Sequence, residues 1–283
     1  MKKVLVTGAG GFIGRRCVAL LAGRGVEVHA VSSRKSCDLL DPGAIDDLVG
    51  RARATHLLHL AWIAEPGVFW SSPANLAWLE AGVHLARRFF HAGGIRAVGA
   101  GSCAEYATSA APCSEAATPL EPETLYGEAK AAMSFALRAA ARGRGSWAWA
   151  RLFFPYGPGE PPGRFIPSVI GGLRRGERVD CTHGRQVRDF IYVDDVAAAC
   201  VALLEADASG AYNVACGEGH SLREVAAEIV RETGRGELVR FDAREAPAYD
   251  PPSVVADIAK IRALGWTPRV GLREGIRLTV GAA

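Results

Sequence analysis

The residues best suited to catalysis are a tyrosine and a lysine four positions apart, Tyr126 and Lys130. On a helix, positions i and i+4 share a face, so the two side chains can meet. An ammonium beside a phenol lowers the phenol's pKa from its usual value of about 10, which makes Tyr126 a candidate general acid or base. Ser102 ends a predicted strand and can hydrogen-bond the same substrate oxygen. The trio suits proton transfer to a carbonyl or an alcohol; the alternative is an ordinary exposed helix face.

A glycine-rich turn follows the first predicted strand directly, in the run Thr7-Gly8-Ala9-Gly10-Gly11-Phe12-Ile13-Gly14. Gly8 permits a tight turn, Gly11 lets backbone N–H groups approach a pyrophosphate, and Gly14 lets the next helix pack closely on the strand. Such a turn alone is a weak signal. Its place between the first strand and the first helix of a βαβ unit favours a dinucleotide site over a purely structural turn.

A regular fold must hold these residues in place. Along the first half of the sequence, short β-rich runs alternate with helical stretches. This alternation is typical of right-handed βαβ units, and it predicts an α/β fold with a Rossmann-type, doubly wound parallel sheet. Asp41 is the expected N-cap of a short helix with Pro42 at its first position. The predicted strands cover residues 4–7, 26–31, 55–60, 95–100 and 147–153, and the longer helices cover about 12–22, 73–91 and 126–141.

The regular alternation stops after Pro155, where prolines at 155, 158, 161 and 162 crowd a glycine-rich turn. We therefore predict an NAD(P)-binding domain over residues 1–154. Residues 155–283 are expected to form mainly a smaller, irregular α/β lobe that binds substrate, with some segments returning to the first domain. Ligands of doubly wound sheets bind beyond the carboxyl ends of the strands, so a lobe over that edge would close a substrate cleft.

Together these motifs resemble the extended short-chain dehydrogenase/reductase family, in its nucleotide-sugar epimerase, dehydratase and reductase group. Asp38-Leu39-Leu40-Asp41 is similar to the family's adenine-contacting segment, and His59-Leu60-Ala61 to the strand motif that lines the cofactor. The resemblance extends to the segments 101–106, 188–195, 212–215 and 264–268. It implies catalysis by Ser102, Tyr126 and Lys130, and cofactor contacts from Gly8, Gly11, Phe12, Ile13, Gly14, Ser33, Arg34, Lys35, Asp38, Leu39, Leu60, Ala61, Tyr126 and Lys130.

The substrate side of the pattern departs from several relatives. Dehydratases of this family place Asp and Glu where Cys103 and Ala104 stand, so dehydration is disfavoured. Phe154 replaces an asparagine that helps to hold the diphosphate in many relatives. The resemblance therefore assigns the diphosphate to Arg188 and Arg164, with a surface ion pair as the alternative for Arg188. Cys103 and Phe154 complete the expected substrate pocket, although a buried thiol without a catalytic role is the simpler interpretation of Cys103.

Cofactor choice depends on the end of the second strand. Enzymes that use NAD usually place an acid there to accept hydrogen bonds from the ribose hydroxyls. Here the strand runs into Ser32-Ser33-Arg34-Lys35, which contains no acid. Two cations and two hydroxyls suit a 2′-phosphate better, so NADP(H) is favoured and NAD(H) remains possible.

The leading hypothesis is an NADPH-dependent reductase of a 4-keto-6-deoxy nucleotide sugar. A nucleotide-sugar C4 epimerase that keeps NAD bound would use the same Ser, Tyr and Lys. A non-catalytic dinucleotide sensor is a third hypothesis, disfavoured because the catalytic trio is complete. Relatives pair helices equivalent to residues 73–91 and 126–141 in a dimer, so a homodimer is expected.

Composition narrows the setting of this chemistry. Seven scattered cysteines with no Cys-x-x-Cys pair argue for free thiols in a reducing compartment and against a disulfide framework or a metal site. The net charge of +3 is too small to imply a nucleic-acid partner. No apolar stretch approaches a membrane span, and glycines interrupt the first apolar run, so the N-terminus predicts a strand and not a leader. A cytoplasmic enzyme is expected.

Overall fold

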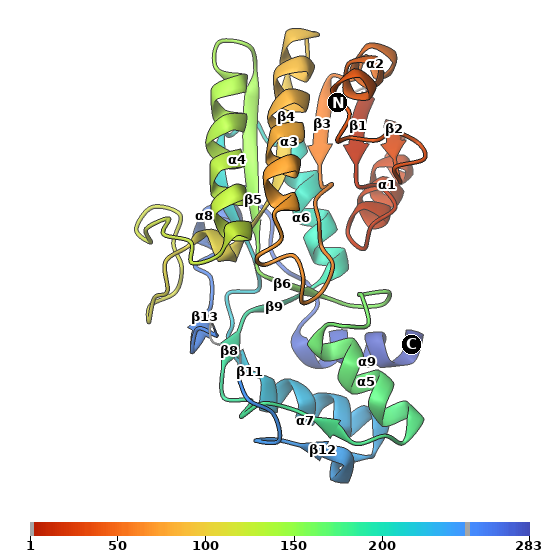
Figure 1. The fold of residues 1–283 in the computed structure, drawn as a ribbon, viewed down its shortest axis with the longest axis vertical. Coiled ribbons are helices and arrows are strands. Elements are labelled where there is room, and N and C mark those ends of the chain that lie inside the picture. Colours follow the sequence, from red (N-terminus) through yellow and green to blue (C-terminus); the bar gives the residue numbers. More distant parts are fainter. Residues whose placement is uncertain (1–2, 247–249) are drawn as a thin grey trace.

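The computed structural model describes residues 3–246 and 250–283. Its centre is a six-stranded parallel sheet, which confirms the predicted fold class (Figure 1). β1 lies between β2 and β3, so the chain changes direction across the sheet there, as in a doubly wound fold. In spatial order the strands are β10 (Gly210–Val214), β5 (Ser146–Leu152), β4 (Arg96–Ser102), β3 (His56–His59), β1 (Lys3–Thr7) and β2 (Glu27–Val31).

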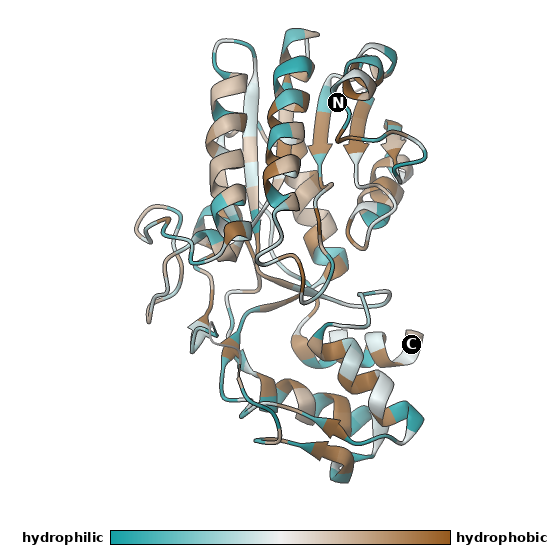
Figure 2. Ribbon diagram, viewed as in Figure 1, coloured by the Kyte–Doolittle hydropathy of each residue, from teal (hydrophilic) through white to brown (hydrophobic). Residues whose placement is uncertain are grey.

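Helices cover both faces of this sheet and bury it in two separate apolar clusters. One face carries α1 (Gly14–Gly23) and α6 (Val193–Glu205), which pack against each other. The other face carries α2 (Pro42–Ala52), α3 (Ala74–His91) and α4 (Leu125–Ala141). In Figure 2, β1 and β3 are brown along most of their length while α3 alternates between brown and teal, as expected for a buried strand and a half-buried helix.

Local sequence explains several element boundaries. Asp41 caps α2 by accepting a hydrogen bond from the backbone N–H of Gly43 at 2.9 Å, as predicted. The first helix begins at Gly14, two residues later than predicted, because residues 8–13 are taken up by the glycine turn. β4 extends to Ser102, so this serine stands at the carboxyl edge of the sheet, as expected.

The second lobe hangs below the carboxyl edge of the sheet (Figure 1). Its own apolar cluster joins α5 (Phe165–Arg175), α7 (Leu222–Thr233) and α9 (Leu272–Ala282). The parallel pair of β6 (Phe154–Tyr156) and β9 (Phe190–Tyr192) lies where the two lobes meet. The smaller elements of the second lobe are β7 (Val179–Asp180), β8 (Val187–Arg188), β11 (His220–Ser221), β12 (Val239–Arg240), β13 (Ser253–Val254) and the 3-10 turn η2 (Gly236–Leu238).

Two elements after residue 154 belong to the sheet layer. β10 pairs in parallel with β5, and α6 packs on α1. α8 (Ala259–Arg262) contacts β10. The chain thus crosses between the lobes more than once, and both β6 and β9 lead from one lobe to the other beside the site.

Candidate active site

The glycine turn is fixed by close backbone contacts. Gly8 has φ of +70°, and a Cβ there would come within 2.8 Å of the backbone nitrogen of Ala61. A Cβ on Gly14 would lie 2.0 Å from the carbonyl oxygen of Gly8, so α1 must start with a glycine to pack this closely. In front of Gly11 the space is open apart from that same carbonyl oxygen at 3.1 Å.

This geometry fits a dinucleotide. The first N–H groups of α1 have no partners within the helix, and the positive end of the helix dipole favours an anion there. The open space at Gly11 leaves room for a pyrophosphate against the backbone. Ile13 is the N-cap of α1, and Phe12 lies under the guanidinium of Arg16 at 5.2 Å. Leu60 and Ala61 contact Gly8, so the predicted third-strand segment adjoins the turn.

The loop after β2 is polar and exposed. Ser33 and Ser36 hydrogen-bond to each other, which closes a tight turn that projects Arg34 and Lys35. Arg34 lies 3.6 Å from Asp38, and both side chains are largely exposed. A surface pair of this kind is weak, so a phosphate can replace the carboxylate as the partner of Arg34. Leu39 is buried in the sheet cluster.

The three predicted catalytic residues converge at the carboxyl end of β4. There Ser102 caps the 3-10 turn η1 (Cys103–Glu105), accepting from the backbone N–H of Ala104 at 3.2 Å. Thr124 caps α4 and sets Tyr126 in its first turn. The Tyr126 hydroxyl hydrogen-bonds to Ser102. A carbonyl oxygen placed beside this pair would have two hydroxyl donors within reach.

Lys130 lies one turn further along α4 and is buried. Its Nζ donates to the carbonyl oxygen of Ala100 at 2.8 Å and lies 3.9 Å from the centre of a Trp62 ring. Burial lowers the pKa of Lys130 to about 7. Trp62 is itself held by a hydrogen bond from its indole N–H to Asn75. No sequence pattern predicted this aromatic cover, because Trp62 lies in the loop after β3.

The expectation that Lys130 lowers the pKa of Tyr126 is wrong for this structure. Burial raises the pKa of Tyr126 well above its ordinary value, and the hydrogen bond from Ser102 and the charge of Arg164 oppose the rise only in part. The ammonium of Lys130 is directed to the carbonyl of Ala100 and lies 5.8 Å from the centre of the Tyr126 ring. The phenol therefore keeps its proton at neutral pH.

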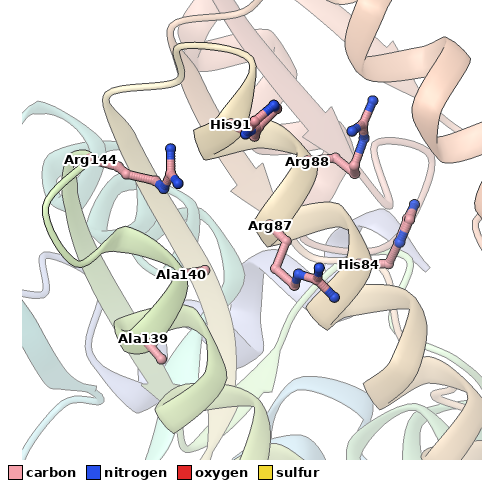
Figure 3. Close-up of a pocket in the computed structure, with 7 residues that line it drawn as sticks. All are labelled: His84, Arg87, Arg88, His91, Ala139, Ala140 and Arg144. Carbon is pink, nitrogen blue, oxygen red and sulfur yellow. The ribbon is translucent and has the colours of Figure 1, made fainter.

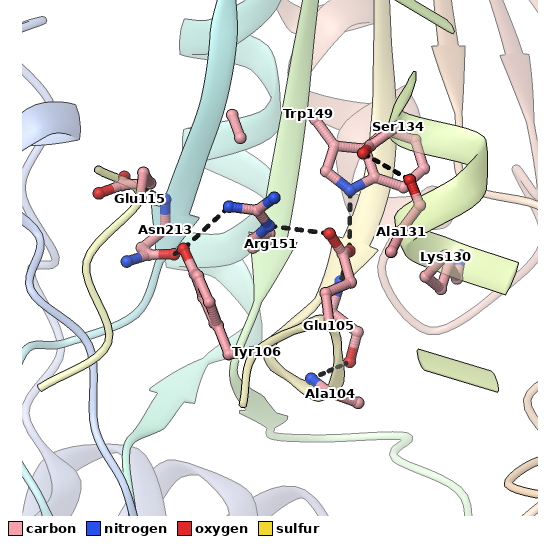
Figure 4. A network of polar contacts seen from close by, with 12 residues as sticks. Ala104, Glu105, Tyr106, Glu115, Lys130, Ala131, Ser134, Trp149, Arg151 and Asn213 are labelled. Atoms are coloured by element: carbon pink, nitrogen blue, oxygen red, sulfur yellow. Dashed lines mark hydrogen bonds and ion pairs between the residues drawn. The ribbon is translucent and has the colours of Figure 1, made fainter. Parts of the chain in front are cut away.

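A buried polar network supports the turn that carries Ser102 (Figure 4). The Glu105 carboxylate accepts hydrogen bonds from the Ser102 backbone, the Trp149 indole and the Arg151 guanidinium, each at 2.8 Å. Arg151 also donates to the Tyr106 hydroxyl, which in turn donates to Asn213 at 2.7 Å. Sequence reasoning missed this network, since a buried ion pair between β5 and η1 leaves no local pattern.

A cavity of about 270 Å³ lies between the lobes and contains most of the predicted substrate residues. Phe154, Arg164 and Arg188 line it, together with the aromatic side chains of Phe69 and Trp70. Both of these rings pack edge-on against Tyr126, with centroids at 4.8 and 5.7 Å. The cavity is thus lined by aromatic side chains together with two arginines, and the Arg188 guanidinium lies over the Phe154 ring at 5.5 Å. Phe69 and Trp70 come from the loop before α3 and were not predicted.

Cys103 lies beside this cavity but is not part of its lining. Its thiol interacts electrostatically with Arg188 and with Tyr126, which places it close to both. Burial raises the pKa of Cys103 to about 12, so the group remains a thiol. A thiol in this state is a poor nucleophile and base, in agreement with a packing role.

Arg188 is buried and held from several sides. Its guanidinium pairs with Asp250 and donates to the carbonyl oxygens of Pro251 and Val187 at 2.7 and 2.8 Å. Gln186 donates to the same Asp250 carboxylate at 2.9 Å. The ion pair considered as an alternative therefore exists, but it is buried at the rim of the cavity instead of at the surface. The next residue, Asp189, is structural, since its carboxylate accepts three backbone N–H bonds.

A second, basic cavity of about 350 Å³ lies far from this site (Figure 3). It is formed near the C-terminal ends of α3 and α4, whereas Tyr126 is in the first turn of α4. Cations at helix C-termini complement the helix dipole, which is a sufficient structural reason for their presence. The lining side chains are His84, Arg87, Arg88, His91, Ala139, Ala140 and Arg144.

Comparison with known proteins identifies the class of protein. Residues 4–215 match the model of the NAD dependent epimerase/dehydratase family. The chain therefore belongs to this family of enzymes, which confirms the resemblance seen in its motifs. Within residues 3–246 and 250–283 no helix is both long and apolar enough to cross a membrane.

Individual relatives differ in activity. CDP-abequose synthase of Salmonella muenchen is 34% identical over 130 residues, which cover 45% of this chain and 44% of the relative. UDP-glucuronic acid decarboxylase 1 of Xenopus tropicalis is 26% identical over 99% of this chain and 71% of its own length. The solved UDP-glucose 4-epimerase of Thermus thermophilus, in complex with NAD, is 28% identical with a TM-score of 0.88, covering 99% of this chain and 98% of that one. MoeE5 in complex with UDP-glucuronic acid and NAD is 29% identical with a TM-score of 0.86 and the same coverage.

Proposed function

We propose that this chain is an NADPH-dependent reductase that converts the 4-keto group of a 4-keto-6-deoxy nucleotide sugar to an alcohol. The observation that carries the proposal is the hydrogen-bonded pair of Ser102 and a protonated Tyr126 beside an apolar cavity flanked by arginines. The dinucleotide turn lies on the same edge of the sheet. The names of relatives such as CDP-abequose synthase and UDP-glucose 4-epimerase support a nucleotide sugar as the substrate.

The proposed chemistry is hydride addition with general acid catalysis. When bound, the nicotinamide supplies the hydride that adds to C4. The electron pair of the carbonyl moves to O4, and the Tyr126 hydroxyl transfers its proton to that oxygen. Ser102 donates a hydrogen bond to O4 and holds the carbonyl in line. Because burial raises the pKa of Tyr126, the phenol is protonated at neutral pH and is in the form that can donate to O4. Solvent then returns the proton to Tyr126.

Lys130 is proposed to hold the cofactor ribose. Its ammonium carries three donors, and the carbonyl of Ala100 accepts one of them. Its burial under Trp62 keeps water away and fixes the side chain beside the position expected for the ribose. Its proposed role is therefore to position the cofactor.

At the other end of the site, Arg164 and Arg188 are proposed to bind the diphosphate. Both line the cavity, and planar guanidinium groups bind phosphate oxygens in pairs. The aromatic wall of Phe69, Trp70 and Phe154 suits a sugar that has lost hydroxyl groups, because a methyl group there buries apolar surface. This apolar wall supports a deoxy sugar over a fully hydroxylated one.

The preference for NADPH rests on the loop after β2. Arg34 and Lys35 are exposed and no acid ends the strand, which supports a 2′-phosphate. Replacing Arg34 and Lys35 together by alanine is expected to raise the KM for NADPH by about tenfold or more, since two charge-assisted contacts are lost. The KM for NADH should change little. Equal losses for both cofactors would contradict the assignment.

A C4 epimerase with permanently bound NAD is the second candidate, favoured by the likeness to the NAD complex of a 4-epimerase. Mass spectrometry of the nucleotide released from the denatured protein separates the two. An empty site or substoichiometric, exchangeable NADP(H) supports the reductase. One equivalent of NAD per chain would contradict the reductase and support the epimerase.

We also propose a homodimer and a cytoplasmic location. α3 and α4 pack side by side and leave Leu76 and Phe135 about half exposed, at 52% and 51%, which supports an interface on these helices. All seven cysteines are free in the structure, which supports a reducing compartment.

A further inference from the structure

Glu160 is a carboxyl group that the proposed chemistry does not use. It lies in the turn between β6 and α5 and lines the substrate cavity together with Arg164 and Arg188. Its Oε2 is buried and has no hydrogen-bond partner among the described residues. Buried polar groups almost always have a partner, so an unpaired carboxyl oxygen at a ligand cavity calls for an explanation.

The surroundings of Glu160 do not satisfy this oxygen. Burial raises the pKa of Glu160 to about 8, while the charge of Arg164 and the backbone N–H of Gly157 lower it only in part. Phe154 and Phe165 also line the cavity and can offer no hydrogen bond. A carboxyl group held this way destabilises the free protein, which is typical of residues kept for a ligand.

The turn that carries Glu160 is firmly attached to the cofactor domain. Arg15 and Arg16 of α1 donate to the carbonyl oxygen of Pro158 at 2.8 and 2.7 Å. Gly159 has φ of +79°, and its missing side chain makes room for the Arg15 guanidinium. Glu160 thus has a fixed position relative to the helix whose N-terminus faces the proposed pyrophosphate.

Resting on the proposed function, we propose that Glu160 is a specificity-determining residue that accepts a hydrogen bond from a hydroxyl or amino group on the substrate's sugar ring. Among the described residues that line the cavity, Glu160 has the one carboxyl group, which keeps an acceptor oxygen even when it is protonated, whereas Arg164 and Arg188 can only donate. Sugar donors need an acceptor, and the rest of the wall is aromatic or aliphatic. The charge of Arg164 acts on both Tyr126 and Glu160, and Glu160 shares the cavity with Phe69 and Trp70, which pack against Tyr126.

The test is isothermal titration calorimetry on the full chain with NADPH present. Four diphosphates, UDP, CDP, GDP and dTDP, are titrated first. The one that binds most tightly is then compared with its glucose and glucosamine derivatives, and the gain in affinity on adding the sugar is the quantity of interest. The comparison is repeated with Glu160→Leu, with Glu160→Gln, and with Glu237→Leu, an exposed glutamate remote from the cavity, as the matched control.

We expect Glu160→Leu to reduce the gain from at least one sugar by about tenfold, the effect of one lost hydrogen bond, with binding of the diphosphate unchanged. Glu160→Gln, which keeps an acceptor oxygen, should retain part of the gain. A larger effect with glucosamine identifies an amine as the partner, and a larger effect with glucose identifies a hydroxyl. The Tm of ligand-free Glu160→Leu should equal or exceed that of the wild type, because the unpaired group is gone.

Two results would overturn the inference in distinguishable ways. If a diphosphate binds but Glu160→Leu leaves both sugar gains unchanged and lowers the Tm, Glu160 is structural and only this inference fails. If none of the four diphosphates binds the wild-type protein, the proposed function fails and the inference with it.

Discussion

At the scale of single residues, burial decides the chemistry of this site. It raises the pKa of Tyr126 and lowers that of Lys130. The phenol therefore stays protonated near neutral pH, and the amine is only partly protonated there. Both effects oppose the charged form of the group, and both exceed the influence of nearby charges. The positions of the two residues follow from their spacing, but these proton affinities depend on Trp62, Phe69 and Trp70, which lie far away in the chain.

Replacing Tyr126 by phenylalanine should lower kcat by about a thousandfold, because the general acid is removed while the ring and its packing remain. The Kd for the nucleotide diphosphate should stay within about threefold of wild type, since no phosphate contact is lost. Steady-state kinetics and calorimetry on the same preparation measure both. Loss of binding together with loss of turnover would mean that Tyr126 is needed for the shape of the site.

Lys130→Met should alter the pH dependence of stability. The folded pKa of Lys130 is lowered to about 7 from 10.5, so the unfolded chain binds more protons between these values and this site's contribution to stability rises with pH there. From about pH 7 to about pH 9 the wild type should gain roughly 2 kcal/mol relative to the variant. Urea denaturation across this range measures it. Lys260→Met, an exposed lysine that also donates to a backbone carbonyl, is the control; a constant difference for Lys130→Met would contradict the burial argument.

At the scale of elements, the position of Ser102, the proposed catalytic serine, depends on how β4 ends. The strand passes into η1, and the buried Glu105 ties that turn to β5 through Trp149 and Arg151. The side chains of Glu105 and Arg151 are 0% and 5% exposed, so their ion pair differs in kind from the surface pairs of the protein. Removing one member of such a pair leaves the other charge buried without a partner.

Glu105→Gln should therefore destabilise the protein by about 3–5 kcal/mol, measured as the free energy of unfolding in urea. Turnover at a temperature where the variant is folded should also fall, because the Ser102 backbone loses its carboxylate partner. Glu177→Gln, which breaks an exposed pair with Arg175, is the control and should change stability little. A Glu105→Gln variant as stable as this control would remove the proposed support of Ser102.

At the scale of the whole molecule, the site lies between two lobes, and the chain passes from one lobe to the other more than once. β6 and β9 pair between them, and β10 returns to the sheet after the chain has passed through the lower lobe. The cavity takes residues from both, with Trp70 from the upper lobe and Arg164 and Glu160 from the connection below.

An interface on α3 and α4 gives a prediction at this scale. Phe135 on α4 is 51% exposed, and Arg138 lies over its ring at 5.4 Å. Phe135→Asp should convert the proposed dimer to a monomer, because a charge would be buried in the apolar centre of the interface. Light scattering coupled to size exclusion measures the mass of both proteins. A monomeric wild-type protein would contradict the proposed dimer. A dimeric Phe135→Asp variant would show that the interface lies elsewhere on the protein.

The sequence predicted five of the six strands of the upper sheet, the glycine turn and the convergence of Ser102, Tyr126 and Lys130, since these depend on local periodicity and fixed spacing. It did not predict β10, which joins the sheet only after the chain has passed through the lower lobe. The lower lobe was predicted only as an irregular region, because its two- and three-residue strands carry no periodic signal. The partners of the proposed site residues could not be predicted at all. Trp62 covers Lys130, Glu105 braces Ser102, and Asp250 holds Arg188 through contacts that the fold alone creates.

The most direct test of the proposed function uses NADPH deuterated at the transferred position and a 4-keto-6-deoxy nucleotide sugar. We predict one equivalent of NADP⁺ for each sugar reduced and one deuterium at C4 of the product, seen by mass spectrometry and NMR, with both lost in Tyr126→Phe. Inversion at C4 of a fully reduced nucleotide sugar, without NADPH consumption or deuterium in the product, would contradict the reductase and identify an epimerase.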